Sequence, residues 1–176
     1  MAATILAANS GLVKQVVFPL EVLPVKTVIA SLLIQLIGST IMIIYVLISN
    51  RSIPATYLLL PLMWLTQFIA MCGVSFILAA LAPYFRDVKD FVQAFCVAGM
   101  YVLPISYLPQ WVPGIIRPLL YLNPFSYMCW CFQDVCYYGR FEHPWAFPVF
   151  FLGSLATFYV GYRLFRKLKV QFGSVL

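Results

Sequence analysis

The chain has 176 residues, of which 64% are hydrophobic and only 9% are charged. An ordinary soluble domain of this size needs more polar surface than these residues supply, so the composition excludes that class. The formal net charge of +6 does not indicate nucleic-acid binding, because the basic residues are scattered among long apolar segments and form no continuous basic face. The sequence therefore predicts an all-α, polytopic integral membrane helix bundle with no nucleic-acid partner.

Four apolar segments are predicted to cross the membrane. The first lies in an uncharged stretch of 24 residues from Thr27 to Asn50, which as a helix reaches about 36 Å and exceeds a hydrocarbon core of about 30 Å. Prolines lie near the ends of the second segment and disrupt the end of the third. The predicted spans are residues 27–49, 56–82, 91–107 and 145–162.

The basic residues orient the predicted bundle. One side holds eight of them, namely Lys14, Lys26, Arg86, Lys89, Arg163, Arg166, Lys167 and Lys169, and the other side holds three, namely Arg51, Arg117 and Arg140. Cytoplasmic segments carry the excess of lysine and arginine in membrane proteins. We therefore predict one transmembrane domain over residues 1–176, with residues 1–26 and the tail at 163–176 both cytoplasmic. The basic cluster at 163–169 is expected to anchor a helix end against anionic membrane lipids.

Residues 108–144 are unusually long for a loop. They contain two apolar runs, Ile115–Leu122 and Phe125–Val135, which are separated by Asn123-Pro124 and are each too short to span. Short apolar helices broken by proline are typical of re-entrant elements, whose backbone groups must be buried in protein or face water. The sequence predicts a short re-entrant helical hairpin on the outer face.

Aromatic side chains concentrate in and beside this segment. Two interpretations stay open: an interfacial belt of rings at the headgroup level, and a path on which sugar rings pack against aromatic faces. The candidate glycan-path residues are Tyr101, Tyr107, Trp111, Tyr121, Tyr127 and Trp130.

No catalytic or metal site is predicted. The single histidine, His143, has no second histidine at metal-ligand spacing and is expected to be a solvated loop residue. Cys129, Cys131 and Cys136 lack zinc spacing, and a single disulfide among them is left open. The chain is expected not to be an enzyme and to bind no cofactor itself.

The predicted spans hold no charged residue, and the chain contains no GxxxxGK[ST] phosphate-binding loop. Ion-coupled transporters usually keep ionisable side chains at mid-membrane depth, and nucleotide binding of the P-loop kind needs that loop. If the chain takes part in active transport, ATP and magnesium are expected on a separate ATPase subunit.

Several short motifs carry a resemblance to a known family. They are NSGLVK at residues 9–14, FPLEVLP at 18–24, Arg86-Asp87-Val88, Pro104-Ile105-Ser106-Tyr107 and Asn123-Pro124-Phe125. In this order and spacing they resemble the polysaccharide and polyol-phosphate export permeases of the ABC transporter superfamily. These proteins export O-antigen, capsule or teichoic-acid chains.

The resemblance implies a bacterial inner-membrane permease that exports a lipid-linked glycan. It also implies six spanning helices per subunit, a homodimer that encloses a channel, and cytoplasmic ABC ATPase subunits encoded separately. By the same resemblance, the residues that contact the ATPase are Lys14, Phe18, Pro19, Glu21, Arg86 and Asp87.

Compared with that family, the chain is expected to lack an amphipathic N-terminal helix and the first two spans. Two alternatives to transport therefore remain at this point. One is a non-transporting fragment or assembly subunit of such a complex. The other is a membrane-embedded transferase, for which Asp87 with Asp90 on the inner side is the candidate acidic pair.

Overall fold

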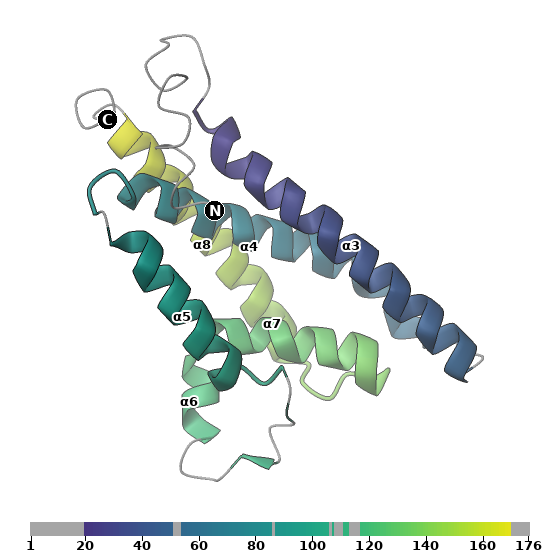
Figure 1. Ribbon diagram of the computed structural model, residues 1–176. Coiled ribbons are helices and arrows are strands. Elements are labelled where there is room, and N and C mark those ends of the chain that lie inside the picture. Colours follow the sequence, from purple (N-terminus) through teal and green to yellow (C-terminus); the bar gives the residue numbers. More distant parts are fainter. Residues whose placement is uncertain are drawn as a thin grey trace. The chain divides into compact units, whose positions relative to one another are not determined.

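The computed structural model describes residues 20–50, 54–85, 87–105, 107, 111–112 and 117–169. Every regular element in these ranges is helical, as the sequence predicts, and none of them is a strand. The elements are α3 (Val22–Asn50), the 3₁₀ helix η2 (Ala55–Leu59), α4 (Leu60–Leu81), α5 (Val88–Val102), α6 (Arg117–Leu122), α7 (Pro124–Gln133), the π-helix η4 (Asp134–Tyr138) and α8 (Ala146–Lys169) (Figure 1).

Three helical segments are long and apolar enough to cross a membrane: Val22–Ser49, Ala55–Leu81 and Ala146–Lys169. They correspond to the first, second and fourth predicted spans. The helix α8 continues past residue 162, the predicted end, and carries Arg166, Lys167 and Lys169 in its last turn. Cations at a helix C-terminus interact favourably with the helix dipole, so these residues extend the helix instead of ending it.

The third predicted span, residues 91–107, corresponds to α5. This helix has 15 residues and ends at Val102, so it reaches only about 22 Å of the roughly 30 Å hydrocarbon core. Pro104 follows two residues later and cannot continue the hydrogen-bond pattern of the helix. A fourth crossing is therefore not confirmed and stays a prediction, and so does the re-entrant hairpin.

The chain forms two compact units. The first contains the described residues of Met1–Ile53, Phe68–Phe91 and Ser154–Leu176, and the second contains Pro54–Gln67 and Val92–Gly153. The unit boundaries therefore fall within α4, α5 and α8.

Phe76 of α4 lies at the centre of the first unit. Its ring centroid is 6.0 Å from that of Phe158, 5.7 Å from that of Tyr162 and 5.4 Å from that of Phe165, all on α8. The start of α3 joins the same core. The buried residues of this core are Leu20, Leu23, Val28, Cys72, Phe76, Ala79, Ala80 and Phe165.

Two glycines allow α4 and α8 to approach at backbone contact. A Cβ atom added to Gly161 would overlap the carbonyl oxygen of Gly73, and one added to Gly73 would lie 2.5 Å from the backbone nitrogen of Phe158. Small residues serve this purpose at helix contacts in membranes, where close packing replaces the hydrophobic effect.

We expect Gly161→Ala to weaken this contact, because the added methyl meets backbone atoms that cannot move alone. Overpacking of this kind costs about 1–3 kcal/mol. Thermal unfolding of the purified chain in detergent, followed by circular dichroism, should show a lower midpoint. Gly153→Ala on the same helix is the matched control, because nothing lies within 4 Å of its added Cβ atom. Equal midpoints for the two variants would contradict the close contact.

Candidate functional site

The candidate ATPase-coupling residues are only partly described. Lys14, Phe18, Pro19 and Arg86 lie outside the described residues. Asp87 is exposed immediately before α5, and its backbone carbonyl accepts a hydrogen bond from the backbone nitrogen of Phe91 at 2.9 Å. Asp87 is therefore accessible to a partner.

Glu21 forms an ion pair that the sequence does not reveal. The Nζ of Lys169 donates a hydrogen bond to the Oε1 of Glu21 at 2.5 Å, which joins the start of α3 to the end of α8. Both side chains are partly buried. Because 148 positions separate the two residues, no local pattern indicates the pair.

The environment of Glu21 lowers its pKa. Burial raises the pKa of this carboxyl, but the hydrogen bond from Lys169 and the charges of Lys169 and Arg166 outweigh the burial. A carboxyl with a lowered pKa stabilises the fold above its ordinary pKa. This contribution is lost as the pH falls through the lowered value.

The Asn-Pro pair of the outer segment separates two short helices. The Oδ1 of Asn123 accepts a hydrogen bond from the backbone nitrogen of Phe125 at 3.1 Å, so Asn123 caps the N-terminus of α7. Pro124 occupies the first helical position, where its missing N–H costs nothing. The break between α6 and α7 therefore lies where the sequence predicts it.

The π-helix η4 is bound by the hydroxyls of η2. Thr56 Oγ1 donates to the carbonyl of Val135 at 2.9 Å, and the hydroxyl of Tyr57 donates to the carbonyl of Cys136 at 3.0 Å. Gly139 then ends the helix with a left-handed φ of 62°, a conformation that glycine adopts without strain. A Cβ atom at Gly139 would also lie 3.1 Å from the side chain of Pro54.

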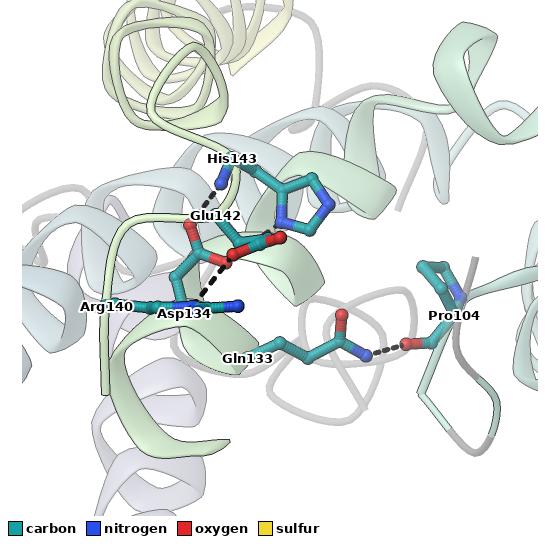
Figure 2. A network of polar contacts seen from close by, with 6 residues as sticks. All are labelled: Pro104, Gln133, Asp134, Arg140, Glu142 and His143. Atoms are coloured by element: carbon teal, nitrogen blue, oxygen red, sulfur yellow. Dashed lines mark hydrogen bonds and ion pairs between the residues drawn. The ribbon is translucent and has the colours of Figure 1, made fainter. Parts of the chain in front are cut away.

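Asp134 and His143 form a buried pair within the second unit (Figure 2). One carboxylate oxygen accepts from the backbone nitrogen of His143 at 2.6 Å, and the other lies 2.9 Å from the ring Nδ1 of the same residue. The Asp134 side chain is 0% exposed and that of His143 is 18% exposed. The prediction that His143 is a solvated loop residue is therefore wrong: Asp134 fixes the loop after η4, and His143 packs inside the unit.

Aromatic rings surround Trp130, which is almost fully buried. Its ring stacks on His143 with centroids 5.6 Å apart and planes 11° apart, and it contacts Trp145 at 5.0 Å. Tyr121 and Tyr127 complete the cluster at 5.1 and 5.4 Å. Three candidate glycan-path residues thus lie together, and Trp145 and His143 join them.

The other three candidate glycan-path residues lie outside this cluster. Tyr101 and Trp111 are 74% and 73% exposed, so their ring faces are available to a ligand or to lipid. Tyr107 is partly buried, and its hydroxyl donates to the carbonyl of Val102 at 2.7 Å.

Polar atoms on one face of α7 lack hydrogen-bond partners. They are Ser126 Oγ, Trp130 Nε1 and Gln133 Oε1. Their residues are spaced by four and then by three positions, which places them on the same face of the helix. The amide nitrogen of Gln133 does donate to the carbonyl of Pro104 at 2.6 Å (Figure 2). Buried polar atoms of this kind usually bind ordered water.

The cysteines of the outer segment are free. Burial raises the pKa of the Cys129 thiol to about 11 and that of Cys136 to about 11, so both stay protonated and poorly reactive at neutral pH. Among the described residues, no three His, Cys, Asp or Glu side chains gather into a group that would hold a metal ion.

Comparison with known proteins bears on the resemblance. No protein-family model matches the chain. Two curated relatives from Klebsiella pneumoniae, both named O-antigen export system permease protein RfbA, are 27% and 26% identical to it over 170 residues. The chain resembles O-antigen export permeases. Each match covers 96% of this chain and 65% of the relative, so the chain spans just under two thirds of the length of the curated relatives it matches. The resemblance predicted from the motifs is thereby confirmed.

The Glu21–Lys169 pair is testable by charge exchange in this permease-like chain. We expect Glu21→Lys to lower the thermal midpoint, because it places two cations together beside Arg166. The exchange Glu21→Lys with Lys169→Glu should recover much of the loss, with a coupling energy of about 0.5–1 kcal/mol for a partly exposed pair. Thermal unfolding in detergent of Glu21→Lys, of Lys169→Glu and of the double exchange measures this coupling energy. Strictly additive effects would contradict the pair.

Breaking the Asp134–His143 contact is expected to destabilise the fold more than breaking the Glu21–Lys169 pair. Asp134→Ala removes both acceptor oxygens and leaves the backbone N–H of His143 without its partner, which costs about 1–3 kcal/mol. Thermal unfolding should show the loss. Glu142→Gln is the control, because its partner Arg140 is 72% exposed and exposed ion pairs contribute little. A midpoint for Asp134→Ala as high as that of the control would show that the buried pair is not formed.

Proposed function

We propose that the chain is the membrane-spanning permease subunit of an ATP-driven exporter of lipid-linked polysaccharide in the bacterial inner membrane. The observation that carries this proposal is the similarity to O-antigen export permeases across 96% of the chain. Three helices that are long and apolar enough to cross a membrane support it.

We further propose a fourth crossing formed by α5 and the residues that follow it up to 107. Four crossings place both termini on the same side, and the positive-inside bias assigns that side to the cytoplasm. The helices α6 and α7 then form the outer-face re-entrant hairpin. Their Asn123 cap and the hydroxyls bound to η4 satisfy backbone groups that lipid cannot satisfy.

In this proposal the chain supplies the conduit and a partner supplies the energy. Two permease copies enclose a channel, and cytoplasmic ABC ATPase subunits contact the segment before α3 and the loop before α5. Nucleotide-driven closure of the ATPases shifts the population of channel states through these contacts. Exposed aromatic faces such as Tyr101 and Trp111 suit a sugar polymer that must slide without tight binding.

The first test is co-purification with the ABC ATPase of the same export system, expressed together with this chain and extracted in detergent. We expect wild-type chain to retain the ATPase and Asp87→Lys to lose most of it, because Asp87 is exposed and its charge is reversed. The Glu21 and Lys169 charge exchange is the second test variant: it keeps the intramolecular pair but reverses the charge at position 21. Loss of ATPase in the exchange variant, with normal thermal stability, assigns Glu21 to the partner contact.

No association in any form of the chain would overturn the coupling proposal. Surface display of the glycan distinguishes a transport subunit from the alternative, a non-transporting assembly subunit. Deletion of a transport subunit should abolish surface display of the glycan, and plasmid-borne chain should restore it. Retention of the ATPase without an effect on surface glycan would favour the assembly subunit.

A further inference from the structure

Three exposed aromatic side chains lie at the end of η4 and in the loop that leads to α8. Tyr137 is 72% exposed, Phe141 is 55% exposed and Trp145 is 40% exposed. Large exposed rings in so short a segment indicate a surface that meets a partner and not only water. The kind of partner follows from where this segment lies along the membrane-crossing helices.

Contacts within the second unit hold the segment in one conformation. Both carboxylate oxygens of Asp134 contact His143. The ring of Phe141 meets that of Phe147 edge to face, with centroids 5.3 Å apart, and Gly139 makes the turn in the left-handed conformation. The exposed rings are therefore carried by a fixed backbone.

The helix α8 places this segment at one surface of a membrane. From Ala146 to Arg163, its first cation, the helix rises about 26 Å, which is close to the hydrocarbon thickness of about 30 Å. Arginine and lysine side chains extend toward the lipid headgroups. When Arg163 and the cations that follow it reach one surface of the bilayer, Trp145 lies at the opposite surface.

The helical segment Ala55–Leu81 leads to the same depth by a separate route. It is long and apolar enough to cross a membrane, so its first residues lie at a membrane surface. Thr56 and Tyr57 in its first turn donate to the carbonyls of η4. The end of η4 is therefore held at the level where this crossing begins.

Packing in the first unit shows that the two crossings begin at the same surface. Gly73 of α4 approaches the backbone of Phe158 on α8. Phe76, one turn further along α4, contacts Phe165, two turns further along α8. The two helices therefore run in the same direction, and helices that both span and run parallel start on the same side of the bilayer.

We propose that Tyr137, Phe141 and Trp145 insert into the lipid headgroup region and anchor the second unit at that depth. Tyrosine and tryptophan favour this region, because their rings are apolar while the hydroxyl or indole N–H binds water or headgroups. The neighbouring ion pair of Arg140 with Glu142, whose arginine side chain is 72% exposed, stays solvated at this level. The inference rests on the membrane crossing in the proposed function and not on transport.

The test is spin labelling of the full chain in vesicles of phosphatidylglycerol and phosphatidylcholine. Tyr137→Cys and Phe141→Cys are made in a Cys96→Ser chain, which lacks the exposed native thiol and by itself corrects for label on other thiols. Accessibility to oxygen and to a water-soluble nickel complex reports depth. We expect both labels about 15–22 Å from the midplane, in the headgroup region. Ile37→Cys, 64% exposed near the middle of α3, is the control and should lie near the midplane.

The outcomes separate the bilayer from other partners. Labels at positions 137 and 141 that the nickel complex reaches as freely as in bulk water would overturn the proposal and leave the rings to a soluble ligand such as a glycan. Spin–spin broadening would overturn it in favour of a second copy. A control label at Ile37 in bulk water would overturn membrane crossing itself, and the anchor with it.

Trp145 provides a second measurement that needs no label. The difference in fluorescence between wild type and Trp145→Phe isolates this ring. Lipids brominated close to the headgroup should quench the difference signal more strongly than lipids brominated near the chain end. Stronger quenching by the deep bromines, or none by either lipid, would contradict the anchor. Size-exclusion profiles and helicity identify variants that fail to fold.

Discussion

Helix ends in apolar surroundings leave carbonyl oxygens that water cannot reach, and this chain pairs many of them with side-chain donors. Thr56 and Tyr57 donate to the carbonyls of η4, and Gln133 donates to that of Pro104. Ser75 of α4 also donates to the carbonyl of Pro24 at 3.2 Å, but Pro24 lies in the first turn of α3, so this bond joins two helices and does not satisfy a helix end. The irregular backbone at η4 and after α5 therefore coincides with side-chain donors that bind its carbonyl oxygens.

Most acidic side chains of the chain also have a partner. The chain has only five acidic residues, and three of them have a basic or histidine partner: Glu21 with Lys169, Asp134 with His143, and Glu142 with Arg140. The first two pairs join segments from different elements and are at least partly buried. A buried carboxylate without a partner would be very costly.

The sequence predicts the helical class, the three helices that are long and apolar enough to cross a membrane and the break at Asn123-Pro124 because each depends on local composition or on one proline. Apolar length alone defines a spanning helix, and a cap acts within one turn. It does not predict the Glu21–Lys169 pair, the Asp134–His143 pair or the contact of Gly73 with Gly161. The Glu21–Lys169 pair and the Gly73–Gly161 contact depend on which helices pack together, and no periodic pattern encodes that. The Asp134–His143 pair joins residues nine positions apart and depends on how the loop after η4 folds back. The end of α5 is predicted only in part. Pro104 indicates that the helix ends near this position, but the segment before it is apolar enough to resemble a full membrane span.

The aromatic residues of the outer segment divide into two groups with different physical consequences. The ring of Trp130 is covered on its faces and edges by His143, Trp145, Tyr121 and Tyr127, so a sugar ring cannot stack on it without opening the cluster. Its packing instead gives the short helices α6 and α7 a core that neither helix is long enough to provide alone. The exposed rings of Tyr101 and Trp111 lie outside that core. If the chain contacts a glycan through aromatic faces, these outer rings can do so while the cluster around Trp130 stays closed.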